Sequence, residues 1–115
     1  MPRKSQKNQL FRAIFEAWCL KFAPEQPVPE HYFHPERKWR FDWCFLELKI
    51  AIEIQGGIWN NGGHNRGRDY EGDCEKHTEA GLLGWMMIYV SWEQVNNGVL
   101  WGYLERAFKA RSENR

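Results

Sequence analysis

The chain has 115 residues, of which 43% are hydrophobic and 27% are charged, and this length and composition fit one globular domain with a modest core. The formal net charge of +1 excludes a strongly basic field over the whole molecule of the kind that marks many nucleic-acid binders. Positive charge is nevertheless concentrated in four short segments, PRKSQK, ERKWR, HNRGR and KARSENR.

The cysteines give no sign of a disulfide framework or of a zinc knuckle. Cys19, Cys44 and Cys74 lie far apart, form no CxxC pair and are odd in number, so we expect reduced thiols in a cytoplasm. No apolar run approaches the length of a membrane span, and the polar start of the chain lacks a signal-peptide core. The sequence therefore predicts a soluble, intracellular protein with no membrane partner.

The predicted elements begin with a helix over residues 7–22, where apolar residues recur three and four positions apart. Three prolines at positions 24, 27 and 29 end this helix and predict an extended connector, because proline removes a backbone donor and biases its predecessor away from helix. Two strands over residues 39–45 and 48–54 follow, with Leu46 and Glu47 as a tight turn between them.

The segment over residues 60–73 is rich in glycine, asparagine and charge and has no apolar periodicity, which predicts a mobile loop. Long loops of this kind are usually functional or disordered. A helix over residues 73–83 is expected next, and it should end at Gly84, which is a typical C-cap residue.

A third strand over residues 85–92 and an amphipathic helix over residues 99–110 complete the chain. The third strand follows a crossover helix, so it should lie parallel to the strand that ends at Ile54. The whole chain, residues 1–115, is therefore expected to be a single domain of the α/β class, with a small mixed β-sheet flanked by helices.

Two carboxylates interrupt the apolar stretch from Phe41 to Trp59. With a two-residue turn, Asp42 faces Ala51, and Glu53 projects from the same face as a diagonal neighbour, with the Cβ atoms of the two acids roughly 6–8 Å apart. Two ionised carboxylates at this distance repel each other in a partly desolvated site unless a cation lies between them. Since Mg²⁺ prefers few carboxylates, several waters and a phosphate, the pattern predicts a magnesium site.

An alternative is that both acids are exposed at the edge of a sheet, or that they pair across strands with Lys49 and Arg40. A three-residue turn would also move the two acids to opposite faces. The metal site is favoured by Gly56 and Gly57 directly after the second strand, because a backbone without Cβ atoms can approach a phosphate closely.

Several short motifs follow one another between residues 37 and 92: FD, then IEIQGG with Trp59 close behind, a loop containing HNRG, DCEK at the start of a helix, and LGW before the last strand. This series resembles the PD-(D/E)XK nuclease superfamily, and within it the Vsr-type very-short-patch repair endonucleases and related small endonuclease domains of phages and bacteria. The resemblance implies a restriction-endonuclease-like core in the order α-β-β-α-β-α. It also implies a DNA endonuclease that uses Mg²⁺, for which Mn²⁺ can substitute, in a bacterial or phage-infected cell.

In that superfamily an aspartate, a glutamate and a backbone carbonyl hold the magnesium, which implies Asp42, Glu53 and the carbonyl of Ile54 as ligands here. Gln55 stands where many members have a catalytic lysine. An amide cannot deprotonate water or neutralise a phosphorane as an ammonium can, so Gln55 would at best orient the attacking water.

Some members of the superfamily supply the lysine from the following helix, and Lys76 is the candidate for such a relocated catalytic lysine. The alternative for Lys76 is a solvated cation that pairs with an acid of its own helix, namely Asp73, Glu75 or Glu79.

Basic and aromatic residues near the acids complete the candidate site. His64 could accept a proton from water or donate to a phosphate, although a plain loop histidine is an equal alternative. Arg66 and Arg68 are predicted to contact DNA phosphates, which position the duplex without reading its sequence. Trp59 could wedge into a distorted duplex or fill the core. The predicted DNA-binding residues are therefore Arg66, Arg68, Arg40, Lys38 and Trp59.

The expected function is a metal-dependent endodeoxyribonuclease that hydrolyses phosphodiester bonds with metal-activated water, and a junction, another branched DNA or a mismatch is the expected substrate. The alternative is a nucleic-acid-binding module on the same fold that has lost catalysis, with Gln55 as its sign. DNA is the expected partner, and the sequence leaves open whether the protein acts as a homodimer.

Overall fold

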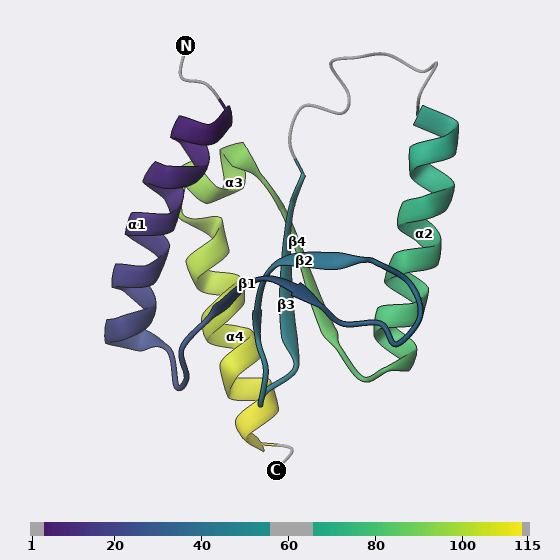
Figure 1. Ribbon diagram of the computed structural model, residues 1–115. Helices are drawn as coiled ribbons and strands as arrows, with labels where there is room; N and C mark the ends of the chain where they lie inside the picture. Colours follow the sequence, from purple (N-terminus) through teal and green to yellow (C-terminus); the bar gives the residue numbers. More distant parts are fainter. Residues whose placement is uncertain (1–3, 56–65, 114–115) are drawn as a thin grey trace.

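The structure is a computed structural model that describes the backbone of residues 4–55 and 66–113 and the side chains of residues 9–55 and 71–113. The helices are α1 (Lys4–Phe22), α2 (Arg66–Leu82), α3 (Trp92–Asn96) and α4 (Val99–Glu113), and the strands are β1 (Val28–Tyr32), β2 (Arg40–Phe45), β3 (Ile50–Gln55) and β4 (Met86–Ser91). The chain is of the mixed α/β class, as predicted, with a sheet flanked by helices (Figure 1).

The strands of the described part of the chain form one sheet in the order β1-β2-β3-β4. β1, β2 and β3 are antiparallel neighbours, whereas β4 lies parallel to β3, because α2 carries the chain back along the sheet. The parallel pairing predicted from the crossover helix is thus confirmed. As a result, the carboxyl ends of β3 and β4 lie side by side, with Gln55 opposite Ser91.

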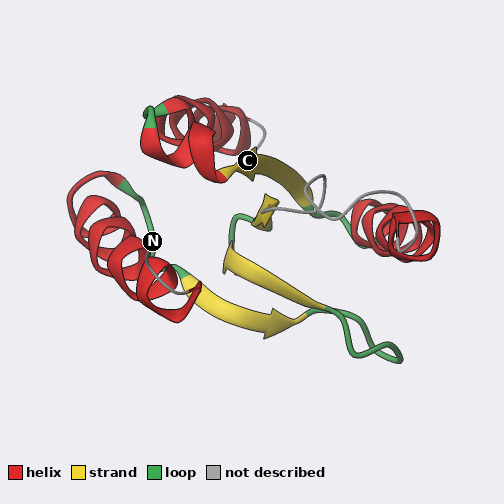
Figure 2. Cartoon of the chain, turned by 90° about the horizontal axis from the view of Figure 1, so that it is seen from above, coloured by secondary structure: helices red, strands yellow, loops and turns green. Residues whose placement is uncertain are grey.

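Helices cover both faces of the sheet (Figure 2). α1 and α4 share the larger hydrophobic cluster with alternate residues of the strands, among them Ile50 and Ile52 of β3. α2 packs on the other face, where Ala80 joins a smaller cluster with Ala51 and Trp85. Because side chains alternate along a strand, Glu53 belongs to the face that α2 covers.

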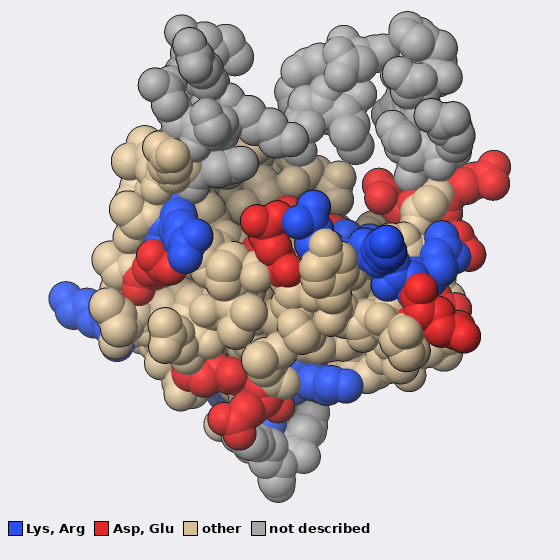
Figure 3. Space-filling model, in the orientation of Figure 1, with Lys and Arg blue, Asp and Glu red and all other residues tan. Residues whose placement is uncertain are grey.

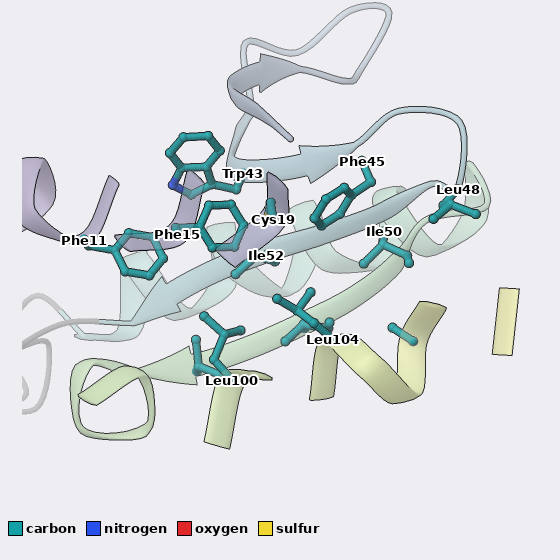
Figure 4. Packing of buried hydrophobic residues seen from close by; sticks show 13 residues of the cluster. Phe11, Phe15, Cys19, Trp43, Phe45, Leu48, Ile50, Ile52, Leu100 and Leu104 are labelled. Atoms are coloured by element: carbon teal, nitrogen blue, oxygen red, sulfur yellow. The ribbon is translucent and has the colours of Figure 1, made fainter. Parts of the chain in front are cut away.

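Aromatic rings pack with aliphatic side chains in the larger cluster (Figure 4). Phe15 of α1 is fully buried, and its ring lies 4.8 Å from that of Trp43 and 5.2 Å from that of Phe11, measured between ring centroids. The rings of Phe45 and Trp101 contact Phe15 from the sheet and from α4. Of the apolar residues that predicted the first helix, Phe11, Phe15 and Trp18 pack toward the sheet, whereas Leu10, Ile14 and Phe22 are exposed. The spacing therefore predicted the helix but only half of the residues on its buried face.

A strand missed by the sequence analysis, β1, lies within the segment predicted as an extended connector. Pro29 belongs to this strand and pairs with Trp43 of β2. β1 is an edge strand of the described sheet, and proline is tolerated there because a backbone donor facing away from the sheet needs no partner strand. The prolines correctly predicted an extended backbone, but the segment was predicted to be a connector and not a strand.

The turn between β2 and β3 spans residues 46–49, so the predicted two-residue turn at Leu46 and Glu47 was wrong. Glu25, which precedes β1, holds this wider turn, because its carboxylate accepts the backbone N–H of Glu47 at 3.1 Å and that of Leu48 at 2.8 Å. Lys49 closes the turn in the left-handed region, with a φ of 56°. The carboxylate that stabilises this turn is thus 22 residues away in the sequence from Glu47, where no local pattern indicates it.

The wider turn shifts the pairing of β2 with β3 by two residues relative to the prediction. Phe45 pairs with Ile50, and continuing this register places Asp42 opposite Glu53 instead of Ala51. A two-residue shift preserves the alternation of side chains, so the acids remain on the same face of the sheet, as predicted.

Helix α2 begins at Arg66, so the predicted loop over residues 60–73 was wrong from residue 66 onward, and the helix predicted to start at residue 73 is longer. Its predicted end at Gly84 is confirmed. Gly84 has a φ of 93°, its N–H donates to the carbonyl of Gly81, and the N–H of Trp85 donates to the carbonyl of Ala80. This pattern is a Schellman motif, which requires a left-handed residue at the position of Gly84.

The strand predicted over residues 85–92 ends at Ser91, whose side chain caps α3. Ser91 Oγ accepts the N–H of Gln94, and Gln94 Oε1 accepts the N–H of Ser91, which forms a capping box. The predicted last helix over residues 99–110 corresponds to α4. None of the helices whose residues are described is both long and apolar enough to span a membrane.

Replacing Phe15 by alanine tests the aromatic core. Phe15→Ala should lower the free energy of unfolding by about 3–5 kcal/mol, because it leaves a cavity between α1 and the sheet. Urea unfolding followed by circular dichroism measures this loss. The matched substitution Leu20→Ala, at a side chain of the same helix that is 87% exposed, should change stability by less than about 0.5 kcal/mol. Equal losses in the two variants would contradict the packing of α1.

Candidate functional site

Asp42 and Glu53 meet where β2 and β3 separate. The backbone N–H of Asp42 donates to Glu53 Oε2 at 2.9 Å, and the backbone N–H of Ile54 donates to Asp42 Oδ2 at 2.8 Å. Each carboxylate thus accepts a main-chain donor of the other's strand, as a backbone carbonyl would do in an unbroken ladder. The two acids therefore hold the ends of the strands together as well as facing a common space.

A cation from α2 reaches this space. Lys76 Nζ lies 2.5 Å from Glu53 Oε1, and the side chains of Lys76 and Glu53 are only 13% and 11% exposed. The sequence analysis expected a cation between the acids, and a lysine of the chain itself provides a counter-charge to one of them. Lys76 pairs with Glu53 and not with the acids of its own helix that were the alternative partners.

Burial governs the ionisation of Glu53. Desolvation raises the pKa of this carboxyl above its ordinary value, and the nearby charge of Asp42 raises it further. The hydrogen bond and the charge of Lys76 and the N–H of Asp42 act in the opposite direction. The residue is thus a carboxylate whose charge depends on its neighbours. Asp42, in contrast, is exposed and open to a ligand.

The cross-strand partners considered for the acids are engaged elsewhere. Arg40 Nη1 lies 2.9 Å from Glu30 Oε1, and Lys49 Nζ donates to the carbonyl of Leu83 at 2.7 Å. The reading of Asp42 and Glu53 as ordinary cross-strand ion pairs with these two cations is therefore wrong.

Two polar residues missed by the sequence analysis border the acids. Tyr89 of β4 is the register partner of Glu53, and the ring of His77 lies 4.1 Å from the Tyr89 ring. The Tyr89 hydroxyl and His77 Nε2 are buried and have no hydrogen-bond partner in the described part of the chain. The parallel pairing of β3 with β4 could have identified Tyr89, because it predicts that alternate residues of β4 share the face of Glu53.

Burial also shifts the pKa values of these two residues. It raises the pKa of the Tyr89 phenol, with the charges of Glu53 and Asp73 acting in the same direction. It lowers the pKa of His77, while Asp73 opposes this shift and Lys76 adds to it. The phenol and the imidazole are therefore kept neutral beside the ion pair.

The donor atoms at the acids suit a hard divalent cation. Asp42 and Glu53 offer carboxylate oxygens, and Ile54 lies between Glu53 and Gln55 in β3. Among the described residues, no group of three or more His, Cys, Asp or Glu side chains could hold a metal ion. A set of two carboxylates fits Mg²⁺, which keeps several waters and binds phosphate oxygens.

The segment between β1 and β2 contacts α2 through Arg37. Arg37 Nη1 lies 3.0 Å from Glu75 Oε2, next to Lys76 in the sequence, and the Arg37 guanidinium lies over the Trp39 ring. Lys38 is exposed between them, and Arg40 follows at the start of β2. The predicted residue Lys38 is therefore on a segment that contacts the helix of Lys76, whereas Arg40 belongs to β2 and pairs with Glu30.

Of the remaining predicted residues, the side chain is described only for Gln55. Gln55 is half-buried at the end of β3, two residues beyond Glu53. Arg66 and Arg68 lie in the first turn of α2 and not in a loop, and their side chains are outside the described residues. His64 and Trp59 are also outside the described residues.

A pocket of ≈ 420 Å³ lies elsewhere, between α1 and the segment that leads to β1, and is lined by residues such as Glu16, Cys19 and Pro27. Burial, with the charge of Glu16, raises the pKa of the Cys19 thiol to about 12, so this thiol is not a nucleophile near neutral pH. Neither Asp42 nor Glu53 lines this pocket, so it is separate from the candidate metal site.

Comparisons of the chain with protein-family models, with curated proteins and with solved structures find no match. The candidate site is therefore assigned from its own geometry and from the order of the motifs.

The stability contributed by the ion pair can be measured directly. Lys76→Ala removes the counter-charge of a buried carboxylate, so it should lower the free energy of unfolding by about 2–3 kcal/mol. The measurement is urea unfolding in the presence of a chelator. Lys109→Ala, at an exposed lysine of α4, is the matched control and should change stability by less than about 0.5 kcal/mol. A loss as small as that of the control would show that Glu53 does not depend on Lys76.

Proposed function

We propose that the chain is a magnesium-dependent DNA endonuclease of the PD-(D/E)XK type, which hydrolyses phosphodiester bonds in branched, junction or mismatched DNA. The observation that carries the proposal is the convergence of Asp42, Glu53 and Lys76 from β2, β3 and α2. Two adjacent carboxylates can hold a divalent ion that activates water for phosphodiester hydrolysis, and a nearby lysine can stabilise the negative charge that develops on the phosphate. The mixed sheet with α1 and α2 on opposite faces is compatible with a restriction-endonuclease-like core.

Asp42, Glu53 and the carbonyl of Ile54 are the residues that would hold the divalent ion. When bound, this ion would supply Lewis acidity toward the scissile phosphate and lower the pKa of a water molecule. Asp42 suits this role because its side chain is exposed, while its bond to the N–H of Ile54 fixes its orientation. Glu53 is anchored by the N–H of Asp42, so the two carboxylates are held in place before any ligand binds.

Lys76 supplies the positive charge that Gln55 lacks. An ammonium beside the acids can donate to a phosphate oxygen as negative charge develops in the transition state, which is the largest single contribution in many hydrolytic enzymes. Gln55 lies two residues past Glu53 on the same face, where its amide can orient a water molecule. His64 remains a candidate proton acceptor outside the described residues.

Binding of the DNA backbone is assigned to basic residues around α2. Arg66 and Arg68 begin this helix, Lys38 belongs to the segment that contacts it, and Arg40 follows at the start of β2. On the face seen in Figure 3, basic and acidic side chains lie in mixed groups, which favours a few local phosphate contacts over broad electrostatic attraction. Trp59 is kept as the candidate wedge residue.

The second candidate function is a DNA-binding module without catalysis, which Gln55 favours because it replaces the usual lysine. The two candidates differ in their dependence on metal. A nuclease should nick supercoiled plasmid or cut a four-way junction with Mg²⁺ or Mn²⁺ and do neither with chelator, whereas the binding module should bind DNA equally well with chelator and cut nothing. The described residues of one chain offer one such pair of acids, so cleavage of both strands in one encounter would require a homodimer.

Neutral isosteres of the two acids test the proposed metal ligands. Asp42→Asn and Glu53→Gln should each reduce nicking of supercoiled plasmid in Mg²⁺ by at least about a hundredfold, because an amide is a poor ligand for a hard cation. Circular dichroism should show an intact fold. Glu105→Gln, at an exposed acid of α4, is the control and should nick at the wild-type rate. Near wild-type nicking by Asp42→Asn would rule out the assignment of this metal site.

The catalytic role of Lys76 is tested at saturating DNA. Lys76→Ala should lower the cleavage rate by at least about tenfold with little change in the Kd for DNA, which is the pattern of a group that acts in the transition state. Adding Gln55→Lys to this variant should recover part of the rate, because it returns an ammonium to the usual position. A wild-type rate in Lys76→Ala would make Lys76 a structural cation only.

A further inference from the structure

The ion pair between Lys76 and Glu53 is largely buried and is complete within the chain. Glu53 Oε1 accepts Lys76 Nζ at 2.5 Å, and Oε2 accepts the N–H of Asp42 at 2.9 Å. The residue as a whole is 8% exposed, so water contributes little to its solvation. In this arrangement Lys76 already provides the positive charge that two neighbouring carboxylates require.

We propose that Lys76 is a resident counter-cation for Glu53, which a divalent ion must displace from Oε1 before it can bind. The inference rests on the proposed metal site and concerns its regulation. Lys76 and a divalent ion on one carboxylate oxygen would be immediate neighbours, and like charges at that separation repel strongly where water is scarce. The two cations therefore compete for Glu53, and the competition weakens metal binding.

Release of Lys76 does not require α2 to leave the sheet, because other contacts hold this helix. Arg37 pairs with Glu75, and His34 Nε2 lies 3.0 Å from Glu79 Oε1. His34 Nδ1 accepts the N–H groups of residues 36 and 37, so the ring carries its proton on Nε2 and donates it to Glu79. Ala80 is buried in the smaller core cluster at the end of the helix.

Displacement of Lys76 from Glu53 frees its ammonium to bind a different anion. While its ammonium is bound to Glu53, the positive charge of Lys76 compensates the protein's own carboxylate. Once displaced, the flexible four-carbon stem lets the ammonium turn to a phosphate oxygen of a bound nucleic acid. The competition thus couples metal binding to the availability of the catalytic cation, and it explains how one lysine can be structural in the metal-free protein and functional in the loaded protein.

The experiment compares divalent-ion binding by wild type, Lys76→Gln, Lys76→Arg and Lys109→Gln. Each full-length protein is titrated with MnCl₂ and with MgCl₂ by isothermal calorimetry at pH 8, without DNA. Lys76→Gln keeps a hydrogen-bond donor near Glu53 but removes the charge, so it should bind the ion about tenfold or more tightly than wild type. Lys76→Arg retains the charge and should stay within about threefold of wild type, as should the matched surface control Lys109→Gln.

A second measurement keeps the inference testable if Lys76→Gln folds poorly without metal. The rise in unfolding temperature between chelator and saturating MnCl₂ should be larger for Lys76→Gln than for Lys76→Arg or wild type, because the metal then replaces a missing counter-charge. An equal or weaker Kd in Lys76→Gln, with equal thermal shifts, would overturn the competition and leave the nuclease proposal standing. Failure of all four proteins to bind either ion would overturn the metal site and this inference together.

Discussion

The ion pair of Glu53 with Lys76 is the interaction on which the proposed site depends. A carboxylate on the covered face of a sheet is costly unless its charge is compensated, and here burial raises its pKa while Lys76 and the N–H of Asp42 oppose that shift. Glu53 cannot move away, because it also accepts a main-chain donor where β2 and β3 part. The pair therefore connects the end of the hairpin to α2 and gives the acids a fixed position.

The two faces of the sheet differ in how they are held. On one face, α1 and α4 bury a continuous set of aromatic and aliphatic side chains. On the other, Ala80 is the one buried residue within the described side chains of α2, and the helix also makes ion pairs with Glu53 and Arg37 and a hydrogen bond with His34. The apolar face stabilises the fold, and the polar face concentrates titratable groups beside the carboxyl ends of β3 and β4. Polar groups placed on a rigid sheet are well suited to hold a ligand.

Local sequence patterns predicted those parts of the fold that local physics controls. The spacing of Phe11 and Phe15 predicted α1, Gly84 predicted the end of α2, and the crossover predicted the parallel pairing of β4. Local patterns failed where residues far apart in the sequence determine the local structure. Glu25 widens the turn after β2, an edge position accepts Pro29, and the start of α2 at Arg66 contradicts a loop predicted from glycine and charge.

The sequence by itself predicted that Asp42 and Glu53 share one face, and this prediction survived the wrong turn length because a register shift of two residues preserves the alternation of side chains in a strand. It also singled out Lys76 as a cation near the acids, although only through a resemblance in motif order. The tertiary structure alone decided that Lys76 contacts Glu53, that Asp42 is exposed while Glu53 is buried, and that His77 packs against Tyr89 beside the acids. Such contacts depend on how α2 docks on the sheet, and docking is set by the summed packing and charge of residues far apart in the chain, which no local pattern records.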